Sequence, residues 1–214
     1  MIGAPEFLAD ARRTYADANA GTMRWMLSRP GRDGVFLNTK QNSITLADYG
    51  DGDGVRGPKF TYGWIQGRGL EALATHAAFF EHSDPPLAAL LDTAGNRLYG
   101  ALDHLQRRDG HAYFCYDEEW VPILVDGERT EPQATPARIF TYSDIFVVKG
   151  LIAAAARYAQ ADVPRHLASL AAIIDAIEAN RFQMDERQIL SDAALAAQPD
   201  DSPVMLSRQR IMLS

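Results

Sequence analysis

The chain has 214 residues, of which 47% are hydrophobic and 23% are charged. This is the composition of an ordinary globular protein that can bury a sizeable core, and it excludes general disorder. The formal net charge is −7, and the lysines and arginines are scattered along the chain. We therefore expect neither nucleic acid nor an anionic membrane as a partner, because both require a basic patch.

The N-terminal residues and the single cysteine indicate the compartment. Charged side chains interrupt the apolar residues of segment 1–18, which is unlike a signal peptide or a membrane span. Cys115 has no second cysteine for a disulfide and no companions for a zinc site. We expect a cytoplasmic protein in which Cys115 is structural, with no metal and no cofactor.

Five long stretches carry apolar residues at helical spacing. They cover residues 5–28, 62–82, 85–107, 142–160 and 163–181, and a short sixth candidate lies at 203–213. Ser143 and Pro164 are reasonable start signals for the fourth and fifth helices. Gly- and Asp-rich sequence at 33–39 and 49–54 predicts short extended pieces and tight turns, and alternation over 111–131 predicts a small hairpin.

The distribution of apolar residues separates inner helices from outer ones. The helix at 142–160 is apolar nearly all round, which is typical of a buried helix. The helices at 85–107 and 163–181 are amphipathic, and charged residues such as Asp92 and Asp103 predict that their outer faces are solvated. An alternation of inner and outer helices describes a helical toroid. The predicted fold class is therefore all-α, of the (α/α)6-toroid type, with short β-hairpin insertions.

The best candidate site lies in the stretch 59–73. At about 100° per residue, Trp64, Arg68 and Glu71 share one face of the predicted helix. An indole can cover the apolar face of a sugar ring while a guanidinium donates hydrogen bonds to the sugar oxygens. A solvated ion pair between Arg68 and Glu71 would explain the same spacing, and the spacing alone leaves both interpretations open.

The predicted start of the fourth helix carries Tyr142 and Asp144, where the cleft of a toroid would lie. The simplest interpretation of Asp144 is a favourable interaction with the positive end of the helix dipole. Glu71 and Asp144 are also the carboxylates that a glycoside hydrolase or lyase would place across such a cleft, and this class stays open as an alternative. A second alternative is a non-catalytic, sugar-binding homodimer.

Three groups of residues, in matching order and spacing, resemble the N-acylglucosamine 2-epimerase superfamily. They are Arg24-Trp25 before Asp33-Gly34-Val35-Phe36-Leu37, then Trp64-Ile65-Gln66-Gly67-Arg68, and then Tyr142-Ser143-Asp144-Ile145-Phe146-Val147 before Gly150-Leu151. The resemblance covers about residues 4–206. It implies that residues 1–206 form the N-terminal half of a twelve-helix (α/α)6 barrel, followed by a tail at 207–214 that departs from the family pattern.

The resemblance also implies a function. Members of this superfamily are sugar 2-epimerases and aldose-ketose isomerases, which use paired histidines to move the proton next to the sugar carbonyl. By this resemblance Arg68, Trp64 and Tyr142 bind a small sugar substrate.

The histidines of the family belong to the second half of the barrel, and none of the five histidines here occupies a family position. No catalytic residue is therefore identifiable in this chain. We expect a truncated chain that is inactive or weakly active alone. An open toroid would expose apolar residues such as Phe146 and Leu151, which favours a homodimer.

Overall fold

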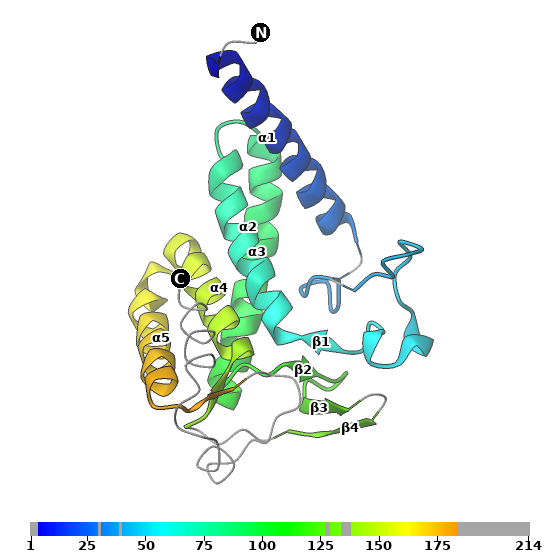
Figure 1. The fold of residues 1–214 in the computed structure, drawn as a ribbon, viewed down its shortest axis with the longest axis vertical. Coiled ribbons are helices and arrows are strands. Elements are labelled where there is room, and N and C mark those ends of the chain that lie inside the picture. Colours follow the sequence, from blue (N-terminus) through cyan, green and yellow to red (C-terminus); the bar gives the residue numbers. More distant parts are fainter. Residues whose placement is uncertain (1–3, 30, 39, 127–128, 134–137, 184–214) are drawn as a thin grey trace.

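Five α-helices make up most of the computed structural model, which describes residues 4–29, 31–38, 40–126, 129–133 and 138–183 (Figure 1). The helices are α1 (Ala4–Ser28), α2 (Gly63–Phe80), α3 (Pro85–Asp109), α4 (Tyr142–Tyr158) and α5 (Val163–Glu178). The first five predicted helices are thus confirmed to within a few residues. The candidate helix at 203–213 and the tail at 207–214 lie outside the described residues.

Short strands gather at one end of the helices (Figure 1). The strands are β1 (Thr61–Tyr62), β2 (Cys115–Tyr116), β3 (Pro122–Asp126), β4 (Arg129–Pro132), β5 (Phe140–Thr141) and β6 (Phe182–Gln183). The first four form an antiparallel sheet in chain order, and β5 pairs in parallel with β6. The hairpin predicted at 111–131 is confirmed as part of this sheet, which also includes β1.

The strands close two helical hairpins at their base. β1 leads directly into α2 and pairs with β2, which follows α3. In the same way β5 leads into α4 and pairs with β6, which follows α5. The two inner helices, α2 and α4, pack against each other, and α3 and α5 return along their outer sides. The fold is therefore mainly helical, with two hairpins whose first helices, α2 and α4, pack against each other.

Local sequence explains where the helices begin and end. The carboxylate of Asp84 accepts a hydrogen bond from Leu87 N at 3.2 Å and caps α3, whose first residue is Pro85. Gly110 ends α3 with a φ of 73°, a left-handed conformation that glycine adopts without strain. Pro164 lies in the first turn of α5, as predicted.

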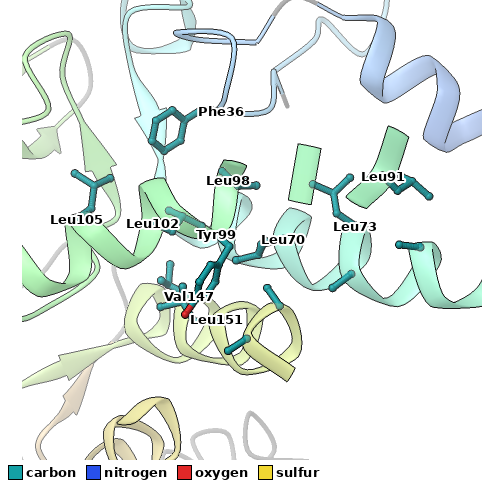
Figure 2. Close-up of a cluster of buried hydrophobic side chains, with 14 of the residues drawn as sticks. Phe36, Leu70, Leu73, Leu91, Leu98, Tyr99, Leu102, Leu105, Val147 and Leu151 are labelled. Atoms are coloured by element: carbon teal, nitrogen blue, oxygen red, sulfur yellow. The ribbon is translucent and has the colours of Figure 1, made fainter. Parts of the chain in front are cut away.

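The core lies between α2, α3 and α4 (Figure 2). Its leucines with no exposed surface are Leu70, Leu73, Leu87, Leu91, Leu98 and Leu151. Burying each such side chain contributes roughly 2 kcal/mol of transfer free energy. The expectation that Leu151 is exposed was wrong, because this residue lies on the side of α4 that faces α2 and α3.

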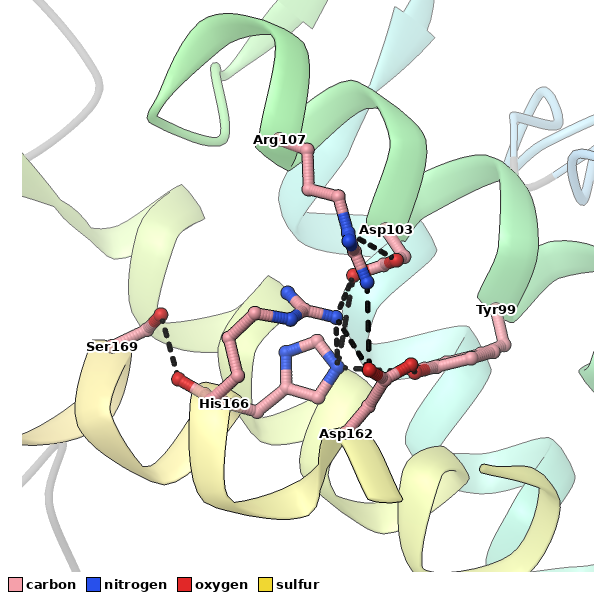
Figure 3. A network of polar contacts seen from close by, with 7 residues as sticks. Tyr99, Asp103, Arg107, Asp162, His166 and Ser169 are labelled. Carbon is pink, nitrogen blue, oxygen red and sulfur yellow. Dashed lines mark hydrogen bonds and ion pairs between the residues drawn. The ribbon is translucent and has the colours of Figure 1, made fainter. Parts of the chain in front are cut away.

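A polar network joins α3 to the start of α5 (Figure 3). Asp103 is 9% exposed and accepts hydrogen bonds from Arg107 at 2.8 Å and from Arg165 at 2.6 Å. The prediction that Asp103 lies on a solvated outer face was therefore wrong. Two guanidinium groups compensate the burial of this carboxylate.

The buried His166 belongs to the same network. The Tyr99 hydroxyl donates to Asp162 Oδ2 at 2.8 Å and lies 3.2 Å from His166 Nε2. His166 has no exposed surface, and its Nδ1 has no hydrogen-bond partner among the described residues. Burial, with a smaller contribution from the charge of Arg165, lowers the pKa of His166 below 6.5. The fold thus disfavours the protonated form of the imidazole.

Helix α1 contacts the rest of the fold through its C-terminal part. Met23 is buried against the core, and Arg24 forms an ion pair with Asp84 at the start of α3. The N-terminal part projects beyond the α2–α3 hairpin (Figure 1). Phe7 and Tyr15 are 61% and 72% exposed there. Among the described residues, no helix combines the length and the apolar character that crossing a membrane requires.

Candidate functional site: the inner face of α2 and α4

Two glycines allow α2 and α4 to meet backbone to backbone. A Cβ atom on Gly67 would lie 2.6 Å from the carbonyl oxygen of Phe146 and 2.6 Å from the Cα atom of Val147. A Cβ atom on Gly150 would collide with the carbonyl oxygen of Gly67. The close approach brings side chains of the two helices together along one edge of the contact. We call this edge, formed by Trp64, Arg68, Tyr142 and Phe146, the inner face.

Phe146 is the residue around which Trp64 and Arg68 meet. The Trp64 and Phe146 ring centroids are 6.0 Å apart with their planes tilted by 44°. The guanidinium carbon of Arg68 lies 5.5 Å from the Phe146 ring centroid, within the range of a cation–π contact. The structure therefore brings together the two residues of α2 that the sequence singled out, and it adds Phe146 from α4. The sequence predicted Phe146 only as an exposed apolar residue, whereas it is half-buried.

Two polar groups that α2 contributes to the inner face lack partners among the described residues. Arg68 is exposed and, within the described part of the chain, makes no ion pair and no hydrogen bond from its side chain. The alternative of a surface pair between Arg68 and Glu71 is therefore wrong in this structure. The Trp64 Nε1–H group is buried and has no acceptor among the described residues. The exposed guanidinium of Arg68, with donors that have no acceptor, favours an oxygen-rich ligand.

The third predicted residue, Tyr142, lies one turn before Phe146 on α4. At about 100° per residue the two side chains share a face of the helix. The Tyr142 ring packs edge-on against Phe182 of β6, with centroids 5.1 Å apart. The structure thus places Tyr142 at the strand end of the inner face, beside the α4–α5 hairpin, while Trp64 and Arg68 meet around Phe146.

Asp144 acts as a cap for α4. Its carboxylate accepts hydrogen bonds from Thr141 N and from Ala112 N, both at 2.8 Å, and His111 Nδ1 lies 3.3 Å away. The cap residue of α4 is Thr141, so the prediction that Ser143 begins the helix was wrong. Thr141 and Asp144 have the spacing of a capping box, a signal present in the sequence.

This role of Asp144 confirms the simpler of its two interpretations. The side chain is 2% exposed and is surrounded by donors that hold its charge at the start of the helix. A carboxylate buried in this way is not presented to a ligand across a cleft. The pair of Asp144 and Glu71 that a glycoside hydrolase would require is therefore not supported.

Gln66 is a site residue that sequence reasoning missed. It is 2% exposed, its Oε1 accepts from Leu37 N at 2.9 Å and its Nε2 donates to Leu37 O at 2.8 Å. These bonds tie segment 31–38 to the first turn of α2. No local sequence pattern predicts these hydrogen bonds, because the two partners are 29 positions apart in the sequence.

A cavity of about 260 Å³ lies between segment 31–62 and the start of α2. Lys40 lines it and donates hydrogen bonds to the carbonyl oxygens of Gly57 and Phe60. Burial lowers the pKa of Lys40 to about 8. Because these bonds hold the ammonium group against the loop, we interpret Lys40 as a residue that fixes the loop.

The five histidines all lie in described parts of the chain, and none shares the stripe of α2 or α4 that forms the inner face. His76 is bonded to Ala72 O at 2.8 Å, and His111 and His166 are buried in the contacts given above. His82 and His104 are exposed elsewhere. In the described ranges, no three histidine, cysteine or acidic side chains cluster closely enough to hold a metal ion.

Comparisons of the chain with family models, with curated proteins and with solved structures each return no match. The resemblance to the N-acylglucosamine 2-epimerase superfamily therefore stays a prediction based on the sequence motifs.

Proposed function

We propose that the inner face binds a monosaccharide, and that the protein is a sugar 2-epimerase or aldose-ketose isomerase for which this chain supplies substrate-binding helices. The observation that carries the proposal is the arrangement of Arg68 and Trp64 around Phe146, with their polar groups unpartnered among the described residues. Aromatic rings and a planar five-donor cation together match a ring that has apolar faces and an oxygen-rich edge.

The fold around this face agrees with the proposal. Helix N-termini carry a partial positive charge, and that of α2 lies at the strand end of the inner face, while Asp144 offsets that of α4. Such ends favour a ligand oxygen that carries or develops negative charge, as the carbonyl oxygen of an open-chain sugar does when the adjacent proton leaves. Tyr142, the first residue of α4, would lie at the edge of the bound sugar.

The test is calorimetric titration of the protein with mannose, glucose and N-acetylglucosamine. Arg68→Ala should weaken binding of the preferred sugar by about tenfold to a hundredfold, the usual loss for a hydrogen bond to a charged group. Arg12→Ala is the matched control, because Arg12 is an exposed arginine of α1. Binding of no sugar, or equal binding by wild-type protein and Arg68→Ala, would contradict the proposal.

A second readout follows the chemistry. Each sugar is incubated with the protein in deuterated water, and exchange of its C2 proton is followed by NMR. Since we assign no general base among the described residues, we expect binding without exchange. Exchange that disappears in Arg68→Ala would place a base in this chain and refute that expectation, while leaving the sugar-binding proposal intact.

A further inference from the structure

A second cation lies beside the inner face. At about 100° per residue, Tyr142, Phe146 and Lys149 share one side of α4. Lys149 is half-buried, and among the described residues its ammonium group has neither an ion pair nor a hydrogen-bond partner. Sugar binding through Arg68 and Trp64 gives this group no role.

Helix geometry directs Lys149 and Arg68 to the same place. Side chains on a helix lean toward its N-terminus, and α2 and α4 both begin at the strand end. Lys149 follows Phe146 by three positions, a spacing that puts their Cβ atoms about 5–6 Å apart. Arg68 approaches the Phe146 ring from α2, with its guanidinium carbon 5.5 Å from the ring centroid. Arg68 therefore contacts the Phe146 ring, and Lys149 lies one turn further along the same side of α4.

The charged side chains beside the inner face have a positive balance, whereas the whole chain is negatively charged. The chain has a formal net charge of −7. The stripe of α2 with Trp64, Arg68 and Glu71 and the stripe of α4 with Lys149 together carry two cations and one carboxylate. Glu71 makes no ion pair with either cation. The partly positive N-terminus of α2 adds to this positive balance, whereas the carboxylate of Asp144 offsets that of α4.

We propose that the sugar bound at the inner face is anionic, a monosaccharide bearing a phosphate or a carboxylate group, with Lys149 and Arg68 as the partners of that group. This inference rests on the proposed function. Lys149 has a half-buried side chain and an ammonium group without a partner among the described residues, so an opposite charge on the ligand would pair with it favourably. A neutral sugar would leave that interaction unused.

The experiment compares mannose, mannose 6-phosphate, glucuronate and inorganic phosphate by calorimetry at low ionic strength. We expect at least one of the two anionic sugars to bind about tenfold or more tightly than mannose, the loss or gain typical of one charged contact. A preference for mannose 6-phosphate would identify a phosphate as the recognised group, and a preference for glucuronate a carboxylate. Equal affinity for mannose and both anionic sugars would overturn the inference and leave the proposed function standing.

Variants locate the effect. Lys149→Gln should reduce the ratio of anionic to neutral affinity to nearly one, Lys149→Arg should restore it, and Glu71→Gln should increase it. Arg12→Gln removes the same charge from exposed α1 and should keep the wild-type ratio. A ratio that survives in Lys149→Gln would contradict the inference. Inorganic phosphate that binds as tightly as mannose 6-phosphate, or no binding of any sugar, would overturn both the inference and the proposed function.

Discussion

Gly67 of α2 and Gly150 of α4 meet where the inner helices cross, and neither position has room for a Cβ atom. The separation of the two helices is thus set by backbone contact. Trp64 and Arg68 reach Phe146 only because of this separation. The geometry of the inner face therefore depends on two residues that contribute no side chain to it.

Replacing Gly67 by alanine should force α2 and α4 apart. The added methyl group meets the Phe146 carbonyl oxygen and the Val147 Cα atom, which are backbone atoms that cannot turn away. We expect Gly67→Ala to lower the free energy of unfolding by about 1–3 kcal/mol, as overpacked cores do. Chemical denaturation measures this loss.

A glycine in open space provides the matched control. Gly100 lies in α3, and a Cβ atom there has no neighbour within 4 Å. Gly100→Ala should raise the free energy of unfolding by up to about 1 kcal/mol, because alanine is the better helix former. If both substitutions stabilise the protein, the close crossing of the inner helices is refuted.

Removing the carboxylate of Asp144 should weaken the start of α4. Asp144→Ala leaves the buried N–H groups of Thr141 and Ala112 without acceptors. We expect a loss of about 2–4 kcal/mol in thermal or chemical unfolding, from two unsatisfied donors and a lost cap. Asp175→Ala, which removes an exposed carboxylate from α5, should change stability by no more than about 0.5 kcal/mol. Equal effects of the two variants would argue against this role of Asp144.

Burial of His166 should make stability depend on pH. Its pKa is lowered in the folded protein, mainly by burial, whereas the unfolded chain titrates near 6.5. The unfolded state therefore binds the proton more readily, and the contribution of His166 to stability, complete above pH 6.5, is lost as the pH falls below that value. Unfolding free energies measured between pH 5 and 8 should decrease toward acid.

Two histidine variants isolate this effect. His166→Gln should give a shallower dependence of unfolding free energy on pH than the wild-type protein, whatever its absolute stability. His104→Gln removes an exposed histidine of α3 and should keep the wild-type slope. An unchanged slope in His166→Gln would show that another group accounts for the acid sensitivity.

Gln66 should hold segment 31–38 in place. Gln66→Leu keeps the size of the side chain but leaves Leu37 N–H and C=O without their bonds to α2. We expect a loss of about 1–3 kcal/mol and faster hydrogen exchange at the Leu37 amide. Gln106→Leu serves as control, because the Gln106 side chain bonds to no other described residue. Unchanged exchange at Leu37 would contradict this role.

Periodicity predicted the elements well, because apolar residues recur at helical spacing in each of the five long helices. The pairing of Trp64 with Arg68 on one face follows from the same periodicity. What it could not predict are contacts between distant positions. In the sequence Asp103 resembles an ordinary surface charge, because its partner Arg165 belongs to another helix. Gln66 likewise shows no partner in the sequence, because it bonds to Leu37, which is distant along the chain. The Thr141 cap, by contrast, had a local signal in the Asp144 three residues later.

The pairing of strands at the base of each helical hairpin makes the hairpins modular. β5 lies against β6, so residues 140–141 and 182–183 are neighbours although a complete α4–α5 hairpin lies between them. β1 and β2 bring the ends of the α2–α3 hairpin together in the same manner. A segment whose ends meet can be duplicated or exchanged without stretching the flanking chain. Each helical hairpin thus enters and leaves the fold at one place, so the length of its helices can change without moving the chain on either side.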